Sequence, residues 1–454
     1  MGATTRRAVA CLGLSLGLPA CNACDPLPEP TLSPCADAAP TIQEVADDAA
    51  TPAWDDKRAE RHACQFGPGS LTTESVGALP HGTELPFDHV VILMLENRSF
   101  DHFLAELPGA DVRTSGVNLD SHGIPIPQAV EQQFCADGDV NHEWEKVHAQ
   151  WHFGQMDGFV VTNHDSPEPM RYFTRDQLPY FYWLAETFAT SERHFSSLLG
   201  PTWPNRYFLL AGTAWGRTST PNEGNWKQIE PPPLSSLSIF DRLVDKGVSV
   251  RLYSDNSVPL TPLMLPDSAV TLWPHAVSEF EADAAAGVLP GVSFVEPMFT
   301  GDERSDDHPP ADVRRGQAFI ERVVKAVAEP ASWPHTVLFV TYDEHGGYFD
   351  HVPPPPACPP DDELPASHAF DRLGVRVPLL AVSPWSVPGH VGQVVTDHTS
   401  ITRFIENRWD LGALTRRDAN AWPLLDLFDF EHPRPFPEGA PAIVPPPAPG
   451  TGCP

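Results

Sequence analysis

The amino-acid sequence predicts an α/β fold, a three-layer sandwich in which helices cover both faces of a central, largely parallel sheet. The first observation is a set of continuous apolar runs, such as DHVVILML at 88–95, which are typical of strands buried on both faces. The second is that apolar residues at helical spacing lie between these runs. The third is size, because 454 residues, 41% of them hydrophobic, are enough for one large core.

Five apolar runs predict the strands of this sheet, at 88–95, 248–253, 292–295, 336–341 and 375–382. Apolar residues at i, i+3, i+4 and i+7 predict one helix over 320–327, and a similar pattern predicts another over 401–409. Residues 239–246 before Gly247 predict a third helix with a glycine stop. Functional residues in such sheets lie at the carboxyl ends of the strands, so a site is expected there.

The N-terminal residues 1–20 differ from this central part and predict a signal peptide. Arg6 and Arg7 precede an apolar run, 8–20, that is too short to span a bilayer. Leu-Pro-Ala-Cys at 18–21 is similar to a bacterial lipobox, so Cys21 is a candidate for lipid attachment, and free secretion is the equal alternative. We therefore expect an exported protein that is secreted, periplasmic or lipid-anchored at the bacterial cell envelope.

The remaining chain divides by composition into three parts. Residues 21–83 are rich in Cys, Pro, Ala and Asp and predict a tether or irregular strap, 84–432 hold the α/β domain, and 433–454, with nine prolines, predict an extended tail. If Cys21 is lipidated and Cys11 is lost with the signal, six cysteines remain. They are compatible with three disulfides of open connectivity in an oxidising compartment: Cys24, Cys35, Cys64, Cys135, Cys358 and Cys453.

The charge of the chain excludes two classes of partner. Sixty acidic residues against 29 Lys and Arg give a formal net charge of −31, and phosphate groups repel such a surface. We expect no nucleic acid and no anionic membrane as partners, and nothing in the sequence implies a protein partner.

Carboxylate and amide side chains follow two of the predicted strands. Glu96 and Asn97 come directly after the run at 88–95, and Asp343 and Glu344 follow the run at 336–341. Adjacent carboxylates emerging from an apolar strand repel each other unless a cation neutralises them, and oxygen ligands suit a hard divalent cation. Turn chemistry and a helix cap are the alternative for Glu96 and Asn97, but they account less well for Asp343 and Glu344.

Thr202 lies in GPTWPNR at 200–206, where Pro204 predicts the first turn of a helix. This places Thr202 at or next to the N-cap, where backbone N–H groups and the helix dipole stabilise an alkoxide or bind phosphate. A capping role alone is the simpler interpretation, and a nucleophile is the functional one. Histidines beside acidic residues at 141–143, 306–309 and 397–400 are weaker candidates, because a lone histidine is more often structural.

Seven motifs in this order resemble the bacterial phosphoesterase family, which groups phospholipases C and acid phosphatases within the alkaline-phosphatase superfamily. The resemblance covers about 86–432 and rests on ENRSFDHFL, the stretch from His142 to Phe159 ending MDGF, GPTWPNR, DDHPP, TYDEHGGYFDHVPPP, DHTSITRFIENRW and RRDANAWPLLDLFDF. It implies an alkaline-phosphatase-like α/β sandwich and a Ser or Thr that attacks phosphorus next to a divalent metal.

Carried to this chain, the resemblance implies that four residues hold the metal: Glu96, Asn97, Asp343 and Glu344. Thr202 would be the nucleophile, with its oxygen also on the metal. His142, His308 and His398 would bind phosphoryl oxygens or assist proton transfer, and His351 is a further candidate. We expect one metal ion rather than two, although Asp307, His308 and His398 are the nearest candidates for a second.

The implied reaction proceeds by two in-line displacements through a phosphothreonine. A phospholipase C that cleaves phosphodiesters is favoured slightly by threonine as the nucleophile, and an acid phosphatase that cleaves monoesters is the alternative. A non-catalytic surface lipoprotein on the same fold is the second alternative. The acidic charge favours zwitterionic choline diesters, whose ammonium could rest on Trp203 or on aromatic residues at 180–183, although core packing is the simpler role of these aromatics.

Overall fold

The computed structural model describes residues 55–221, 237–256, 259–265, 273–361, 370–448 and 453. The predicted signal peptide 1–20, Cys21, Cys24, Cys35 and most of the predicted tether lie outside these residues. In the part of the chain that is described, no helix is both long and apolar enough to cross a membrane.

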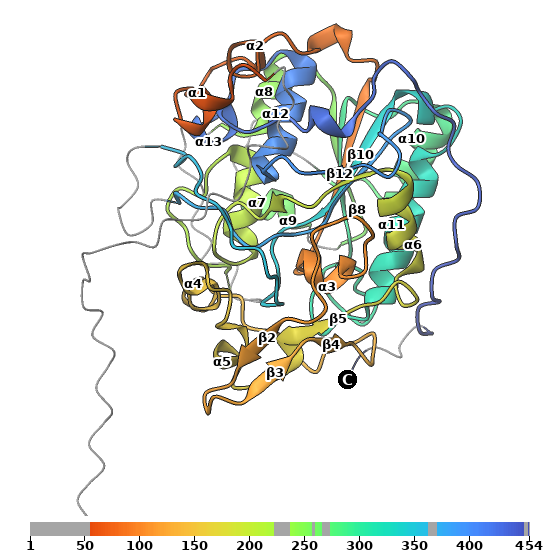
Figure 1. The fold of residues 1–454 in the computed structure, drawn as a ribbon. Helices are drawn as coiled ribbons and strands as arrows, with labels where there is room; N and C mark the ends of the chain where they lie inside the picture. The colour runs from red at the N-terminus through yellow and green to blue at the C-terminus, as the bar shows by residue number, and fades with distance from the viewer. Residues whose placement is uncertain are drawn as a thin grey trace, which may run out of the picture. The chain divides into compact units, whose positions relative to one another are not determined.

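A seven-stranded sheet forms the centre of the fold (Figure 1). Its strand order is β12 (Val391–Gly392), β6 (Ala189–Ser191), β11 (Leu379–Val382), β10 (Thr336–Tyr342), β1 (His89–Leu95), β9 (Val292–Glu296) and β8 (Val250–Ser254). Every neighbouring pair is parallel except the two that involve β11, which is antiparallel to β10 and β6. The prediction of a largely parallel sheet is therefore confirmed.

Helices cover both faces of the sheet. Successive residues of a strand point to opposite sides, so the apolar strands present a hydrophobic surface on each face. On β1, Val90, Ile92 and Met94 belong to one buried apolar cluster, and Val91 and Leu93 belong to another. The first cluster packs against α7 (Thr202–Ala211), α8 (Ile239–Asp245), α9 (Leu260–Met264) and α12 (His398–Trp409). The second packs against α3 (Phe100–Leu104), α6 (Pro179–Thr187), α10 (Val277–Ala286) and α11 (Val313–Val327). The three-layer prediction is confirmed.

The predicted strand at 375–382 is shorter than expected and runs against its neighbours. The strand begins only at Leu379, because Pro378 has no N–H to donate to a ladder and ends the regular pairing. The two residues before Pro378 make other contacts. The buried side chain of Arg376 forms ion pairs with Asp101 and Asp350, and the N–H of Val377 donates to the carbonyl of His194 at 3.0 Å. An apolar run shows burial but not direction, so the sequence could not reveal the antiparallel pairing.

A smaller group of elements, residues 116–172, projects beyond the sheet, and we call it the hairpin unit (Figure 1). It contains the antiparallel pair β2 (Val117–Leu119) and β3 (Pro125–Pro127). It also contains the helices α4 (Trp144–Trp151) and α5 (Phe159–Thr162), the 3₁₀ turns His152–Gly154 and Glu168–Met170, and the short pair β4 (Ala129–Val130) and β5 (Arg171–Tyr172). Its own small apolar cluster includes Phe159 and packs against Phe349, seven residues after the end of β10.

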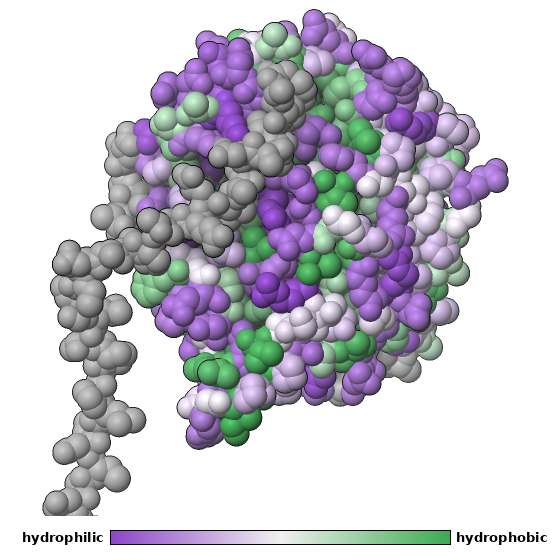
Figure 2. All heavy atoms as spheres, viewed as in Figure 1, coloured by the Kyte–Doolittle hydropathy of each residue, from purple (hydrophilic) through white to green (hydrophobic). Residues whose placement is uncertain are grey.

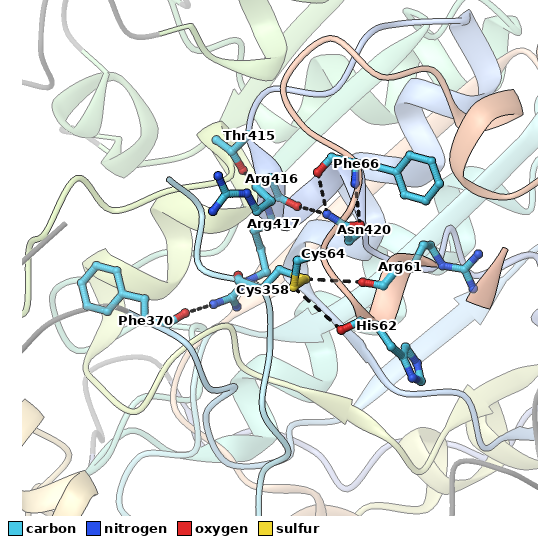
Figure 3. Close-up of a disulfide and its surroundings, with 10 residues drawn as sticks. All are labelled: Arg61, His62, Cys64, Phe66, Cys358, Phe370, Thr415, Arg416, Arg417 and Asn420. Atoms are coloured by element: carbon cyan, nitrogen blue, oxygen red, sulfur yellow. Dashed lines mark hydrogen bonds between the residues drawn. A yellow bond between two sulfur atoms is a disulfide. The ribbon is translucent and has the colours of Figure 1, made fainter. Parts of the chain in front are cut away.

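Two disulfides link the N-terminal and C-terminal segments of the described chain to the α/β domain. Cys64 follows α1 (Arg58–His62) and is bonded to Cys358, and Cys135 is bonded to Cys453. Near the first bond, the N–H of Phe66 donates to Asn420 Oδ1 at 3.2 Å, and Asn420 Nδ2 donates back to the carbonyl of Phe66 at 2.8 Å (Figure 3). Residues 55–83, with α2 (Thr72–Ser75) and the 3₁₀ turn Gly82–Glu84, thus lie against the C-terminal helices α12 and α13 (Arg416–Ala419).

The proline-rich segment 433–448 contains no helix or strand. Its Phe436 ring lies 5.1 Å from the ring of Trp333, and Trp333 Nε1 donates to the carbonyl of Arg434 at 2.9 Å. The remaining described elements are β7 (His194–Phe195), which pairs in parallel with β13 (Thr396–Asp397), and the 3₁₀ turns Trp333–His335 and Leu425–Leu427.

Candidate active site

The parallel register of β1 and β10 brings the predicted metal ligands together. Leu95 pairs with Tyr342, so the residues that follow each strand emerge side by side at the carboxyl edge of the sheet. The N–H of Asn97 donates to Asp343 Oδ1 at 3.3 Å. Gly346, at φ +63°, lies so close to the backbone of Asn97 that a Cβ there would stand 2.3 Å from its carbonyl oxygen. We call Glu96, Asn97, Asp343 and Glu344 the strand-end cluster.

The strand-end cluster is buried, and two of its oxygens have no hydrogen-bond partner among the described residues. Asn97, Asp343 and Glu344 are fully buried, and Glu96 is 7% exposed. Glu344 Oε2 accepts from the N–H of Gly346 at 2.7 Å, but Glu344 Oε1 and Asn97 Oδ1 are both unpaired. A buried carboxylate oxygen without a donor is costly, whereas a divalent cation is bound by this kind of oxygen. The donor set therefore fits a hard divalent metal ion.

Arg206 is the cation that the structure places against this cluster. Its Nε lies 2.8 Å from Asp343 Oδ2, and its Nη2 lies 3.3 Å from Glu96 Oε1. Burial raises the pKa of Asp343 to about 6 and that of Glu96 well above its usual range, and the nearby arginine only partly offsets this. Arg206 and the protonated ring of His142 beside Glu344 are two positive charges against three buried carboxyl groups, which leaves room for a further positive charge.

Thr202 is the first residue of α7, as the sequence predicted, and Pro201 occupies the N-cap. Pro201 offers no side-chain hydrogen bond to this end, and the N–H of Trp203 donates to Thr220 Oγ1 at 3.1 Å. Thr202 and Arg206 are four residues apart and share one face of α7. Arg206 contacts Glu96 and Asp343, so Thr202 lies on the face of α7 whose next turn reaches the strand-end cluster.

Three of the four predicted histidines gather around the cluster. His142 Nδ1 donates to the carbonyl of Val140 at 2.6 Å, and its Nε2 lies 3.3 Å from Asn97 Nδ2 and 3.8 Å from Glu344 Oε1. His398 Nε2 donates to the carbonyl of Asp343 at 2.6 Å, which leaves His398 Nδ1 buried without a partner. The His308 ring lies 5.5 Å from the His142 ring.

The electrostatic surroundings of these histidines differ. Burial alone would lower the pKa of His142, but the carboxylates of Glu344 and Asp139 raise it to about 9. Burial lowers the pKa of His398 to about 4, although the carbonyl of Asp343 favours its charged form. The site thus combines a ring that holds its proton with one that remains neutral.

His351 lies in a different group of side chains. Its Nδ1 lies 2.6 Å from Asp101 Oδ2 and its Nε2 lies 2.9 Å from Asp111 Oδ1, so both ring nitrogens are paired. Arg376 is ion-paired to Asp101 and Asp350 in the same group. We call Asp101, Asp350, His351 and Arg376 the salt-bridge cluster. In the structure as described, no hydrogen bond or ion pair joins His351 to Thr202 or to the strand-end cluster.

The candidate ligands of a second metal are not assembled as the sequence suggested. Asp307 Oδ2 accepts from the hydroxyl of Tyr342 at 2.7 Å, and burial raises the pKa of Asp307 to about 8. Among the described residues, ligand atoms within 4.8 Å of one another occur in three groups, and none of them contains Asp307 or His398. The groups are Asp139, His142 and His308, then Asp101, Asp350 and His351, and the disulfide-bonded Cys135 and Cys453 with Asp312.

Sequence reasoning missed Arg206 and Asp139, although each had a signal. Arg206 stands one helical turn after Thr202 in GPTWPNR, and Asp139 is three residues before His142. The suggestion that aromatics at 180–183 meet choline is wrong for Tyr180, Phe181 and Tyr182, which are at most 1% exposed in the core. Trp203 is also buried, with its ring 6.1 Å from that of Tyr207.

Residues 87–412 match the model of the Phosphoesterase family. The chain belongs to this family. It is 33% identical over 397 residues to a non-specific phospholipase C6 of Arabidopsis thaliana, a match that covers 79% of this chain and 75% of that protein. It is 32% identical over 437 residues to a phospholipase C B of Mycobacterium tuberculosis, with 80% and 82% covered. These matches identify the chain as a phosphoric ester hydrolase.

A third relative is longer than this chain. The chain is 29% identical to a hemolytic phospholipase C of Pseudomonas aeruginosa, covering 77% of this chain but 57% of that protein. Among solved structures, a protein in the alkaline phosphatase superfamily from Vibrio parahaemolyticus matches at a TM-score of 0.38 and 8% identity, with 79% and 72% of the two chains covered. The family assignment rests on the sequence matches alone.

Proposed function

We propose that this phosphoesterase is an exported, metal-dependent hydrolase of the phospholipase C type that works through a phosphothreonine at Thr202. The observation that carries the proposal is the pair of buried, unpaired oxygens, Asn97 Oδ1 and Glu344 Oε1, beside a helix that begins at Thr202. Relatives named phospholipase C at about 30% identity support the type of reaction.

Glu96, Asn97, Asp343 and Glu344 are the residues that would hold one divalent ion, with Thr202 as a further oxygen ligand. When bound, the ion would neutralise the carboxylates and stabilise negative charge on the attacked phosphoryl group. Arg206 keeps Glu96 and Asp343 oriented through its two contacts.

Thr202 Oγ1 is the proposed nucleophile, aided by the positive end of α7. It loses its proton and forms a bond to phosphorus, while the bond from phosphorus to the leaving oxygen breaks and the leaving alcohol takes up a proton. Water then hydrolyses the phosphothreonine. His398 Nδ1 has no partner and can accept a proton, whereas the charged ring of His142 is placed to donate to a phosphoryl oxygen. His308 donates through Nδ1 to the carbonyl of Pro309 at 2.6 Å, and burial lowers its pKa well below the usual range, so its Nε2 is a proton acceptor.

A choline phosphodiester is the substrate class that we favour over a phosphomonoester. The net charge of −31 opposes the approach of a dianion, whereas a phosphocholine diester carries no net charge. The alternatives are an acid phosphatase and a lipoprotein without catalysis. Assays with p-nitrophenylphosphorylcholine and p-nitrophenyl phosphate should give the higher kcat/KM for the diester, and a preference for the monoester between about pH 5 and 8 would identify a phosphatase.

Export through a signal peptide at 1–20 is part of the proposal, and so are two fates for Cys21. The disulfides Cys64–Cys358 and Cys135–Cys453 support an oxidising compartment. Mass spectrometry of protein from the exporting host should show either a diacylglyceryl group on Cys21 or a free N-terminus downstream. A chain that still begins near Met1 would contradict both.

Thr202→Val tests the nucleophile, since valine has nearly the same shape and lacks the oxygen. We expect kcat/KM to fall by about 10³-fold or more, because the covalent step has no other acceptor. The free energy of unfolding should change by no more than about 1 kcal/mol, since Thr202 caps no helix end with its side chain. Activity above a few per cent of wild type would refute the assignment, and Thr220→Val is a matched control.

A further inference from the structure

The hairpin formed by β2 and β3 has its apolar and polar faces reversed. In a hairpin packed on a protein core, apolar residues normally face inward and polar residues outward. Here Asn118 points inward and is 1% exposed, with its Oδ1 accepting from the N–H of Phe159 at 2.9 Å. The outward residues are apolar and exposed: Val117, Leu119, Ile124, Pro125 and Pro127. We call these five residues the hairpin face.

The exposure of the hairpin face is large for apolar side chains. Val117, Leu119 and Ile124 are 51%, 53% and 55% exposed. In the same unit, Phe153 is 71% exposed and Val161 is 50% exposed. Figure 2 shows hydrophobic surface at the end of the molecule that carries β2, β3 and α5. Clustered exposed apolar residues of this kind mark contact with a partner or a membrane.

The hairpin unit also holds part of the active site. His142, which contacts Asn97 and Glu344, precedes α4 in this unit, and Gln150 of α4 bonds His345 through Oε1 at 2.8 Å. The same unit packs on Phe349, and the ring of Phe159 lies 5.3 Å from it. The hairpin face is thus joined to these elements through β2, where Asn118 accepts from the N–H of Phe159.

The size and charge of the hairpin face favour a lipid bilayer over a protein. Five side chains offer a few hundred Å², well below the ~800 Å² per partner of a stable protein interface, whereas a few inserted apolar side chains add usefully to membrane binding. Residues 117–172 contain nine Asp and Glu against Lys146 and Arg171 alone. Such a surface is repelled by anionic lipid but tolerates a neutral headgroup whose outermost group is cationic.

We propose that the hairpin face docks this enzyme onto the surface of a zwitterionic, phosphatidylcholine-type bilayer, with the active site next to the headgroups. The choice of bilayer rests on the proposed phospholipase C function. The apolar residues enter the interface, while Asp120 and the acidic residues of the unit remain among the cationic choline groups.

Co-sedimentation with phosphatidylcholine vesicles tests the docking, with all proteins carrying Thr202→Val so that the lipid is not consumed. The combined Leu119→Ser and Ile124→Ser variant should lower the vesicle partition coefficient about tenfold or more, because exposed apolar area is lost. The control, Val288→Ser, removes a side chain that is 60% exposed after α10 and should bind as the parent protein does. Binding should persist in high salt and weaken when phosphatidylserine is added.

Activity measurements on proteins with native Thr202 separate docking from catalysis. The Leu119→Ser and Ile124→Ser variant should hydrolyse soluble p-nitrophenylphosphorylcholine at the parent rate. Its activity on vesicles should fall by the same factor as its vesicle partition coefficient. Vesicle binding equal to the parent's would overturn the docking proposal, and so would a parent that cleaves the soluble diester without binding vesicles. A dimer that the variant converts to monomer would assign the face to a second copy instead. A parent that binds vesicles through the face but cleaves no phosphoester would refute the proposed function alone.

Discussion

Two buried clusters of carboxylates lie beyond β1 and β10, and they differ in how their oxygens are satisfied. The strand-end cluster takes Glu96 and Asn97 from the end of β1 and Asp343 and Glu344 from the end of β10. The salt-bridge cluster takes Asp101 from α3 after β1, and Asp350 and His351 from the loop after β10. A buried arginine pairs with the carboxylates of each cluster: Arg206 contacts the strand-end cluster, and Arg376 is part of the salt-bridge cluster.

In the salt-bridge cluster every carboxylate oxygen of Asp101 and Asp350 accepts a hydrogen bond. Asp101 Oδ1 accepts from Arg376 and Oδ2 from His351, while Asp350 accepts from Arg376 at Oδ1 and from the N–H of Asp101 at Oδ2. In the strand-end cluster Glu344 Oε1 and Asn97 Oδ1 accept none among the described residues. Buried acidic groups alone therefore do not indicate a metal site, and unpaired oxygens are the better sign.

Glu344→Gln changes the strand-end cluster and should have the largest effect on activity among the variants of the two clusters. The amide oxygen of Gln can still accept from the N–H of Gly346, but the charge that would bind a cation is lost. We expect metal content to fall and kcat/KM to drop about 10²- to 10³-fold. The metal-free variant should be as stable as the metal-free parent, and elemental analysis with thermal unfolding checks both. A variant with full metal occupancy would show that Glu344 is structural.

Asp350→Asn should have the opposite profile. Removing one partner of a buried, hydrogen-bonded ion pair costs about 3–5 kcal/mol of unfolding free energy, because Arg376 then has only the charge of Asp101, which it shares with His351. Metal content and kcat/KM per folded molecule should remain close to those of the parent. Denaturant unfolding measures the first effect, and a loss of metal without loss of stability would contradict the division between the clusters.

Arg206→Lys should sharpen the comparison, because Arg206 makes salt bridges to two carboxylates of the strand-end cluster. A lysine cannot keep both contacts, to Glu96 and to Asp343. We expect the metal-free protein to lose about 1–3 kcal/mol of unfolding free energy and the metal-loaded protein to lose less, because a bound cation would also neutralise the carboxylates. Equal losses with and without metal would place Arg206 outside the metal site.

His351→Gln should have the smallest effect and concerns pH. Burial disfavours the charged ring, but the hydrogen bond to Asp101 and the negative charges of Asp101 and Asp350 together outweigh it and raise the pKa of His351. A raised pKa adds stability that is complete below the unfolded value of about 6.5 and is lost as pH rises through the folded pKa. The parent should therefore lose more Tm than the variant between about pH 6 and pH 9, by no more than about 2 °C. A Tm difference that does not change with pH would exclude this contribution.

Sequence analysis recovered the parts of the molecule that local pattern determines. The apolar runs located β1 and β10, and the polar residues directly after them were Glu96, Asn97, Asp343 and Glu344. The antiparallel direction of β11 was missed because direction depends on the neighbouring strand rather than on the run itself.

The difference between the two clusters could not be read from the sequence, because it depends on long-range partners. Asp343 and Asp350 follow the same strand seven residues apart, and the local sequence does not show the partner of either carboxylate. Arg376 reaches Asp350 and Asp101 only after the chain has folded, and Arg206 reaches Asp343 across 137 positions of sequence. The family resemblance made His351 a candidate, and its two paired ring nitrogens place it in the salt-bridge cluster.

Metal titration of three proteins, the parent, Glu344→Gln and Asp350→Asn, tests the central claim most directly. Each is stripped with a chelator, and the binding of a divalent ion is followed by calorimetry together with the Tm of the loaded and stripped forms. The account predicts one ion per chain in the parent and in Asp350→Asn, and about 10- to 100-fold or more weaker binding in Glu344→Gln. Unchanged binding in Glu344→Gln, or lost binding in Asp350→Asn, would contradict it.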